Sequence, residues 1–490
     1  MKRKAGIILI LIALFFASEI LQRVNASYSI DAGIAPTLVL PPPQAQTTEQ
    51  PIQKLDTQAL LQISALLDEK QSRTPAQQKI DSQLLYAAKM RRGESIAAGI
   101  PTLSVDVGAD DAGAVTVDMT ALVDDSLISL LGAMNVEIVS AFPEYHTLRA
   151  KTSLDRLETI AGLAQVKFIQ PKQEARYAQA ELPNPSPTAR GEYSDFKERA
   201  DRVRNELQQV LVPKAPGDIV QQVGSVTSQG DTTHRAYTAR GTFNVDGTGI
   251  KVGVLSDGVT SLSISQASGD LGPVTVLSGQ AGSGDEGTAM LEIIHDLAPG
   301  AQLYFATADG GIASFANNIR GLRSAGCDII LDDVGYFVES PFQDGQTTSI
   351  VSTNNGGLAT QAVNDVTAAG ALYFSAAANS GNKNDNTSGT WEGNFVNGGT
   401  LSLLAGGNVH DFDPTAAVAQ YDSVTSGTSL LNLHWSDPLG ASNNDYDLFV
   451  LNSTGTSVLA SSTNIQNGTQ DPYEQSIAFA NSRVVVLQKT

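Results

Sequence analysis

The chain has 490 residues, and its 31 Lys and Arg against 51 Asp and Glu give a formal charge of −20 at pH 7. This acidic excess argues against a nucleic-acid-binding protein, because such proteins carry a basic surface. With 41% hydrophobic and 17% charged residues, the composition is globular and leaves room for about two to four domains. The single cysteine excludes an internal disulfide, so burial of apolar surface must hold the fold together.

The N-terminus predicts export. Basic residues 2–4 precede an unbroken apolar run over 5–17, which is about the length of a signal-peptide core. Val24-Asn25-Ala26 then offers small residues for cleavage, so we expect a signal peptide at 1–26. A membrane anchor is the alternative, but Glu19 interrupts the segment well short of the ~20 apolar residues that a span needs. We therefore expect a secreted or periplasmic protein without a stable membrane anchor.

Residues 27–112 give a weak pattern. The prolines at 41–43 and the Gln and Thr residues after them are typical of a linker. Residues 55–70 and 75–92 predict polar helices whose packing the sequence leaves open. We expect a poorly defined, partly helical N-terminal region.

Residues 113–171 are better organised. Their apolar pattern predicts four strands and two helices in the order β-α-β-β-α-β, which is a small ferredoxin-like α+β module. The expected strands are 115–119, 136–140, 146–152 and 166–169, and the expected helices are 127–134 and 154–163. Residues 172–240 are charged and partly helical, and they predict a linker.

Residues 241–398 alternate between short apolar strands and helices. The expected strands are 250–255, 302–307, 328–331 and 371–377, and the expected helices are 287–297, 313–325 and 358–369. This alternation predicts an α/β fold with a parallel sheet covered by helices on both faces. In such sheets ligands collect at the carboxyl ends of the strands, where Asp257, Glu286 and Asn379 are expected.

This region resembles the subtilisin-like serine proteases. The sequence at 252–258 (VGVLSDG) is similar to the strand and loop that carry the family's catalytic Asp, which would be Asp257. The sequence at 373–381 is similar to the strand that leads to the oxyanion-hole Asn, which would be Asn379. The resemblance covers residues 247–395 and implies an incomplete subtilisin-like core.

The family's catalytic His is replaced. Glu286-Gly287-Thr288, followed by Ala298-Pro299-Gly300-Ala301, resembles the segment that begins with this His, so Glu286 stands in its place. The sedolisins, a related group with the same fold, use Glu as the base. In that group an Asp one turn later supports the Glu, but here Met290 occupies this position, so Asp257 is the expected partner. Two carboxylates this close should share a proton over an acidic range.

The alternative is that Glu286 is only an acid at a helix N-terminus, which the helix dipole favours by about 0.5 kcal/mol. Against this, Glu286 shares one helical stripe with Met290, Ile293 and Leu297, which predicts an inward-pointing carboxylate.

The resemblance implies acyl transfer on a protein or peptide substrate. A serine attacks the peptide carbonyl, the Glu286 and Asp257 pair accepts its proton, and Asn379 donates to the oxyanion. Because the reference pKa of Glu is about 4.3, we expect a pH optimum below neutral. Asp332 and Asp333 follow the strand 328–331, where the family builds a substrate wall ending at a Gly like Gly335. Asp333 there could bind a basic substrate side chain, couple to Glu286, or belong to a salt-bridged loop.

The nucleophile is not found by this resemblance. The one Gly-Thr-Ser match is 427–429, but residues 430–435 alternate as a strand, so we do not interpret Ser429 as the nucleophile. Either the serine lies beyond Thr490 in a longer natural protein or the chain is a pseudoenzyme. The strand-like end at 484–487 favours truncation.

Residues 399–490 predict a β-sandwich of short strands, which resembles the small domains appended to secreted bacterial peptidases. Asp445 and Asp447 are candidate calcium ligands or, alternatively, solvated turn acids; no other cofactor is expected. By position, the module at 113–171 resembles a propeptide that acts in cis on the catalytic core. The sequence thus predicts a secreted serine endopeptidase precursor, with a non-catalytic secreted binding protein for protein or glycan as the alternative.

Overall fold

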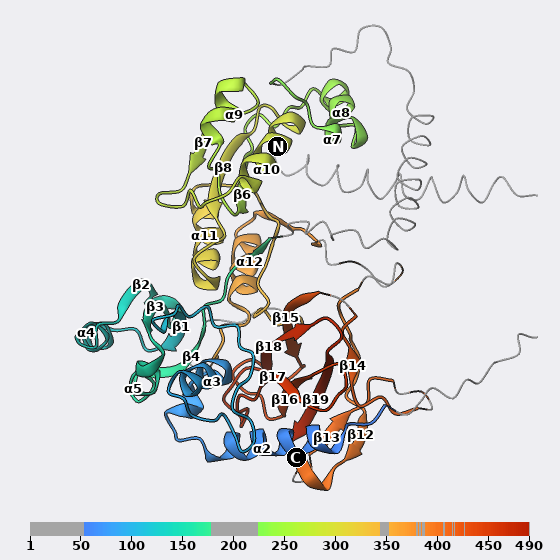
Figure 1. Ribbon diagram of the computed structural model, residues 1–490. Helices are drawn as coiled ribbons and strands as arrows, with labels where there is room; N and C mark the ends of the chain where they lie inside the picture. The colour runs from blue at the N-terminus through green and yellow to red at the C-terminus, as the bar shows by residue number, and fades with distance from the viewer. Residues whose placement is uncertain are drawn as a thin grey trace, which may run out of the picture. The chain divides into compact units, whose positions relative to one another are not determined.

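The computed structural model describes most of the chain after residue 52 (Figure 1). The described residues are 53–177, 224–343, 352–378, 381, 384, 388–404, 407–413, 415, 417–425 and 427–489. The predicted signal peptide at 1–26 and the predicted oxyanion residue Asn379 lie outside them. The described elements all belong to one contact-defined unit that begins at Pro51.

Two helices form the start of this unit. They are α2 (Thr57–Ser72) and α3 (Ser82–Arg91), with the 3₁₀ turn η1 (Gln77–Lys79) between them. The side chains of Asp56 and Asp81 accept bonds from the backbone N–H groups of Gln58 and Gln83 and cap the two helix starts. The helices expected within 27–112 are therefore present, and they pack against defined neighbours.

The next elements follow the predicted order of strands and helices. They are β1 (Ala114–Ala121), α4 (Asp125–Ala133), β2 (Glu137–Phe142), η2 (Pro143–Tyr145), β3 (Thr147–Ser153), η3 (Leu154–Arg156), α5 (Leu157–Ala161) and β4 (Val166–Pro171). The four strands form one antiparallel sheet in the order β2-β3-β1-β4. Both helices and α3 pack on its apolar residues in one shared core.

A parallel sheet follows, as the sequence predicts. Its elements are β6 (Lys251–Ser256), α9 (Leu262–Ser268), β7 (Val274–Val276), α10 (Glu286–Leu297), β8 (Gln302–Thr307), α11 (Ile312–Ser324), β9 (Ile329–Asp332), α12 (Leu358–Ala368) and β11 (Leu372–Ser375). The strand order is β11-β9-β6-β8-β7, and every pairing is parallel.

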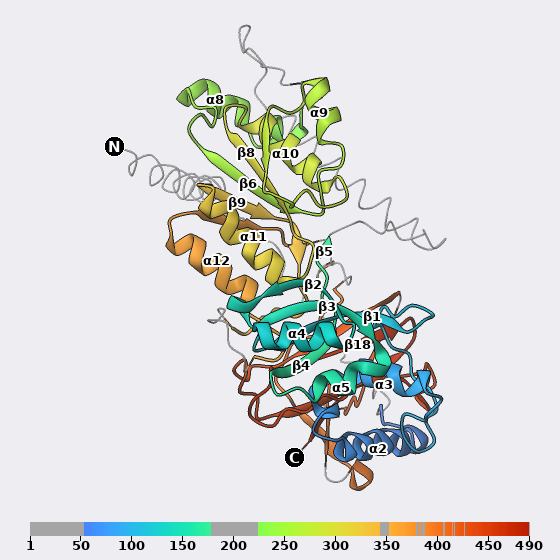
Figure 2. The ribbon, with the colours of Figure 1, turned by 90° about the vertical axis from the view of Figure 1, so that its left-hand side faces the viewer.

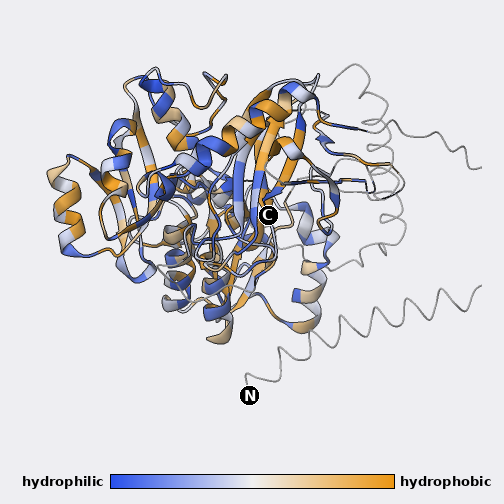
Figure 3. Ribbon diagram, turned by 90° about the horizontal axis from the view of Figure 1, so that it is seen from below, coloured by the Kyte–Doolittle hydropathy of each residue, from blue (hydrophilic) through white to orange (hydrophobic). Residues whose placement is uncertain are grey.

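Helices cover both faces of this sheet. Val254 and Phe305 point to one face, where Leu291 of α10 packs on them. Leu255 and Ala306, the next residue of each strand, point to the other face and pack against α11 and α12, which lie side by side in Figure 2. The alternation of hydrophobic and hydrophilic residues along the helices and strands (Figure 3) reflects this division into a buried and a solvent-facing side.

The segment expected as a linker, 172–240, contains ordered elements at both ends. Strand β5 (Arg176–Tyr177) pairs antiparallel with β10 (Val334–Gly335). Helices α7 (Gln229–Thr233) and α8 (Ala236–Phe243) precede the parallel sheet. The linker interpretation is wrong at these positions. The elements are short and contain charged residues, so they show no local apolar pattern, and the partner of β5 is far away in sequence.

The C-terminal region consists of antiparallel strands. They are β12 (Asn397–Thr400), β13 (Asn408–His410), β14 (Asp422–Ser423), β15 (Thr428–His434), β16 (Asp445–Leu451), β17 (Val458–Ser462), β18 (Tyr473–Phe479) and β19 (Arg483–Lys489), with the turn η4 (Ser402–Leu404). One sheet has the order β12-β13-β19-β16-β17, with β14 also on β19, and β15 pairs with β18 in a second sheet. Ser429 lies inside β15 opposite Ala478, in agreement with the expected strand. We call residues 397–489 the sandwich region.

Among the helices that the structure describes, none combines the length and the apolarity needed to cross a bilayer.

The burial of Phe305 predicts how much its removal destabilises the fold. Its ring is fully buried between β6 and α10, so Phe305→Ala should lower the free energy of unfolding by about 3–5 kcal/mol. Phe374→Ala is the matched control, because Phe374 is 57% exposed, and it should cost less than about 1 kcal/mol. Urea unfolding followed by circular dichroism measures both, and equal losses would contradict the assigned core.

Candidate functional site

Asp257 is fixed at the carboxyl end of β6. Its side chain is 7% exposed, and Oδ1 accepts the backbone N–H of Gly258 (2.5 Å) and of Gly287 (3.1 Å). Its own carbonyl accepts the Thr307 hydroxyl from the neighbouring strand β8 at 2.8 Å. The carboxylate therefore joins the end of β6 to the first turn of α10.

Two glycines allow this close approach. Gly284 has φ of +124°, and a Cβ there would run into the Asp257 carboxylate. A Cβ on Gly287 would lie 2.4 Å from the Phe305 ring and 2.5 Å from the Gly258 carbonyl oxygen. Without side chains at these positions, the backbone lies directly against Asp257 and places residue 286 beside it.

Glu286 is the first residue of α10, and its carboxyl group lies beside that of Asp333. Glu286 Oε2 and Asp333 Oδ1 are both buried, and neither accepts a bond from a donor among the described residues. Burial and the interaction with the carboxyl groups of Asp333 and Asp257 raise the pKa of Glu286 to about 7.

The carboxyl group that acts most on Glu286 is that of Asp333, not that of Asp257 as the sequence predicted. We expected Asp257, but among the described contacts its carboxylate accepts backbone amides and acts on Glu286 through its charge. Asp333 takes the partner position because β9 lies next to β6 in the sheet. Of the three interpretations left open for Asp333, the structure supports contact with Glu286, and no described ion pair involves Asp333.

The stripe used to orient Glu286 was also wrong. Ile293 is 48% exposed, whereas Gly287, Thr288 and Leu291 are buried. The core-facing side of α10 is therefore rotated from the predicted stripe. Glu286 itself is half-buried, with Oε2 shielded from solvent.

Asp332 has a structural position. It is buried, its Oδ2 accepts the Tyr373 hydroxyl at 2.6 Å, and its Oδ1 accepts the Ser375 hydroxyl at 2.7 Å. These bonds tie β9 to β11. Adjacent aspartates thus have different surroundings: Asp332 is held within the sheet, and Asp333 contacts Glu286.

A short extended segment pairs with the strand that follows Asp333. In the pairing of β5 with β10, Val334 is opposite Tyr177 and Gly335 is opposite Arg176. The Tyr177 hydroxyl donates to Asp309 Oδ1 at 2.7 Å. Sequence reasoning missed both Tyr177 and Asp309, although Asp309 follows the expected strand 302–307 at the same sheet edge. An acid directly after an expected parallel strand could have identified Asp309 as a candidate site residue.

Of the other predicted site features, Asn379 lies outside the described residues, and Ser429 belongs to the sandwich region. The Lys70 ammonium lies 2.7 Å from an oxygen of each candidate calcium ligand, Asp445 and Asp447. Within the described residues, no group of three or more His, Cys, Asp or Glu side chains is arranged to hold a metal.

No protein-family profile and no curated protein matches this sequence. Some solved structures are similar to segments of it. One is fervidolysin from Fervidobacterium pennivorans, a keratinolytic enzyme related to subtilisin, with 13% identity over 58% of this chain and 42% of that chain and a TM-score of 0.28. Another is the epidermin leader peptide processing serine protease from Staphylococcus aureus, with 10% identity, 56% and 62% coverage and a TM-score of 0.31. A mutant of that protease gives 13% identity, 56% and 63% coverage and a TM-score of 0.31. The chain spans less than two thirds of each of these structures.

The raised pKa of Glu286 can be measured directly. Carbon-detected NMR of the Glu286 side-chain carboxyl should show a titration midpoint near pH 7. Asp333→Asn removes a negative charge and supplies an amide donor, so the midpoint should fall by at least about one pH unit. Asp328→Asn, at the opposite end of the same strand, is the control and should leave the midpoint unchanged. A midpoint near 4.5 in the unaltered protein would contradict the carboxyl pair.

Proposed function

We propose that this chain is the precursor of a secreted serine endopeptidase of the subtilisin and sedolisin type, with Glu286 as the general base. The observation that supports the proposal is the proximity of the Glu286, Asp333 and Asp257 carboxyl groups, which raises the pKa of Glu286 to about 7. This group of acids lies at the carboxyl edge of a parallel sheet, where α/β proteins place their ligands.

The carboxyl pair suits proton transfer near neutral pH. A general base works best when its pKa lies near the operating pH, and that of Glu286 is about 7. The deprotonated pair would accept the proton of a serine hydroxyl as its oxygen bonds to the peptide carbonyl carbon. When the carbon–nitrogen bond breaks, the pair would return this proton to the leaving amine.

The charge of Asp257 strengthens this role. Held by two backbone amides, its carboxylate raises the proton affinity of Glu286 through electrostatic repulsion. Asn379 stays the predicted oxyanion donor, a role that contributes about 10²–10³ in rate. The attacking serine is not assigned, because no described serine hydroxyl is hydrogen bonded to Glu286.

The propeptide assignment belongs to the same proposal. Strand β5 directly follows the module at 113–171 and lies antiparallel to β10, which begins immediately after Asp333, the partner of Glu286. An extended segment paired with an exposed strand is a common mode of peptide recognition. In the precursor, Arg176 and Tyr177 would therefore occupy some of the substrate wall and block it in cis.

The base assignment predicts a pH profile different from the one expected from the sequence. Because the pKa of Glu286 is raised to about 7, casein cleavage by the full-length product should increase as pH rises through about 7, when the pair loses its proton. Glu286→Gln should lower the rate by at least about 10²-fold. Glu292→Gln, on the same helix, is the control and should retain the rate.

Assays from about pH 3 to 9 measure both effects. Equal activity of the Glu286→Gln variant and the unaltered protein would refute the base. If neither the unaltered protein nor the Glu286→Gln variant cleaves casein, but both bind a protein or glycan equally well, the non-catalytic alternative is favoured.

The cis-blocking role predicts a gain of activity. Tyr177→Pro removes a backbone N–H from β5 and should weaken its pairing with β10, so the uncleaved precursor should hydrolyse casein several-fold faster. Tyr177→Phe keeps the backbone pairing, loses only the bond to Asp309, and should have a smaller effect. Initial rates before any processing give the comparison. A precursor that is equally active in all three forms would contradict the block.

A further inference from the structure

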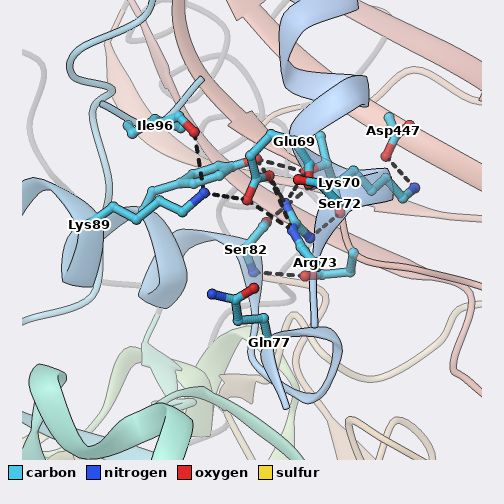
Figure 4. Close-up of polar contacts among 12 residues, drawn as sticks. Glu69, Lys70, Ser72, Arg73, Gln77, Ser82, Lys89, Ile96 and Asp447 are labelled. Carbon is cyan, nitrogen blue, oxygen red and sulfur yellow. Dashed lines mark hydrogen bonds and ion pairs between the residues drawn. The ribbon is translucent and has the colours of Figure 1, made fainter. Parts of the chain in front are cut away.

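A lysine side chain is buried against two carboxyl groups of the sandwich region. Lys70 of α2 is 1% exposed, and its Nζ lies 2.7 Å from Oδ1 of both Asp445 and Asp447. The two acids are two residues apart on β16, so their side chains lie on the same face of the strand. Asp447 is fully buried, and Figure 4 shows the Lys70 side chain beside it. The ammonium group and this carboxylate therefore meet away from solvent.

The ion pair leaves buried polar atoms without partners. Asp447 Oδ2 accepts no hydrogen bond from any residue that the structure describes. The Lys70 ammonium has three N–H donors, whereas its described acceptors are one oxygen each of Asp445 and Asp447. Buried charges and unpaired polar atoms cost free energy. An amide between Lys70 Nζ and Asp447 Cγ would keep one N–H for Asp445 and would lack the unpaired oxygen.

We propose that Lys70 and Asp447 form an intramolecular isopeptide bond, with Asp445 as the proton carrier. The reaction joins Lys70 Nζ to Asp447 Cγ and breaks the bond from Cγ to Oδ2. Of the three ammonium protons, one stays on the amide nitrogen and two leave with the oxygen as water. The positive and negative charges of the pair cancel in the product. The bond therefore needs no oxidant, reductant or further reactant.

Asp445 is positioned to move these protons. Its Oδ1 contacts Lys70 Nζ directly, so it accepts a proton from the nitrogen and donates it to the departing oxygen of Asp447. Burial acts to lower the pKa of Lys70, but the charges of the neighbouring carboxylates raise it overall. The resting state is therefore an ion pair. Transfer of a proton from Lys70 to Asp445 must come before attack, because only the neutral amine has a free electron pair.

Two physical effects favour the amide at this position. Groups held in contact by a fold can have an effective concentration of about 10⁵ M or more, which opposes hydrolysis of the bond. Burial also disfavours ions more than a neutral amide. The burial of Asp447 has this effect, because it raises the pKa of the carboxyl group to about 6 even beside the Lys70 ammonium.

A neighbouring lysine and carboxylate provide an internal comparison. Lys89 Nζ lies 2.6 Å from Glu69 Oε1 (Figure 4). Both oxygens of Glu69 also accept bonds from Arg73 Nε, at 3.3 and 3.1 Å. Each oxygen of this carboxylate thus has a donor, and the lysine is 15% exposed. We expect Lys89 and Glu69 to stay an ion pair, because neither has the burial and the unpaired oxygen of the Lys70 site.

Peptide mapping of the folded full chain tests the bond. Trypsin does not cut after an acylated lysine, so the peptide that ends at Lys70 should be absent after denaturation and digestion. Its sequence should appear in a branched product, whose mass is that of the two parent peptides less one water molecule. A folded protein that releases the Lys70 peptide in linear form would overturn the proposal.

Variants assign the reacting groups. Asp445→Asn keeps both linked residues and removes the proton carrier, so the branched product should form at least about 10²-fold more slowly in freshly synthesised protein. An unchanged rate would overturn the role of Asp445. Lys89→Met is the matched control and should give the same branched product at the same rate as the unaltered protein.

Asp447→Asn keeps the acceptor carbon and changes the leaving group, so linkage should release ammonia instead of water. Circular dichroism shows whether each variant folds, and if Asp445→Asn does not, Asp447→Asn decides the outcome. Loss of ammonia, or a folded variant without a branched product, assigns the acceptor to Asp447. Loss of water would place the bond on another acid and overturn the proposal. This readout is independent of peptide hydrolysis, so the bond and the proposed function are tested separately.

Discussion

The parallel pairing of β6 with β8 and β9 is the constraint on which the candidate site depends. It brings the carboxyl ends of three strands to one edge, and each of them is followed by an acid: Asp257, Asp309 and Asp333. Glu286 adds a fourth from the start of α10. No ion pair among the described residues neutralises Glu286 or Asp333, and burial together with the neighbouring carboxyl groups raises the pKa of Glu286 to about 7.

The distant contacts of Lys70 organise the chain at a larger scale. Lys70 and Asp447 are 377 positions apart, yet they meet in a buried ion pair. The α/β unit is therefore inserted in sequence between two segments of a single core, one before it and one after it. Residues 53–177 consequently contact both the sandwich region, through α2 and α3, and β10 at the edge of the α/β unit, through β5.

Local chemistry explains which sequence-based expectations held and which did not. The β-α alternation was reliable because period-two strands and amphipathic helices follow from near neighbours in the chain. The charged segment at 172–240 misled us because β5 has only two residues, and its pairing with β10 leaves no local pattern. The acids Asp445 and Asp447 resemble calcium ligands in sequence, whereas in the fold they surround an ammonium group.

The sequence alone determined the parallel α/β unit, its helices on both faces, and the presence of Asp257 and Glu286 at one sheet edge. These features depend on residue periodicity and on strand direction, which a single chain records. Only the tertiary structure decided that Asp333 is the partner of Glu286, because that depends on which strand lies beside β6. Likewise, only the tertiary structure showed that Lys70 forms a buried ion pair with the sandwich region. The partners of an ion pair are close in space, and their spacing along the chain does not identify them.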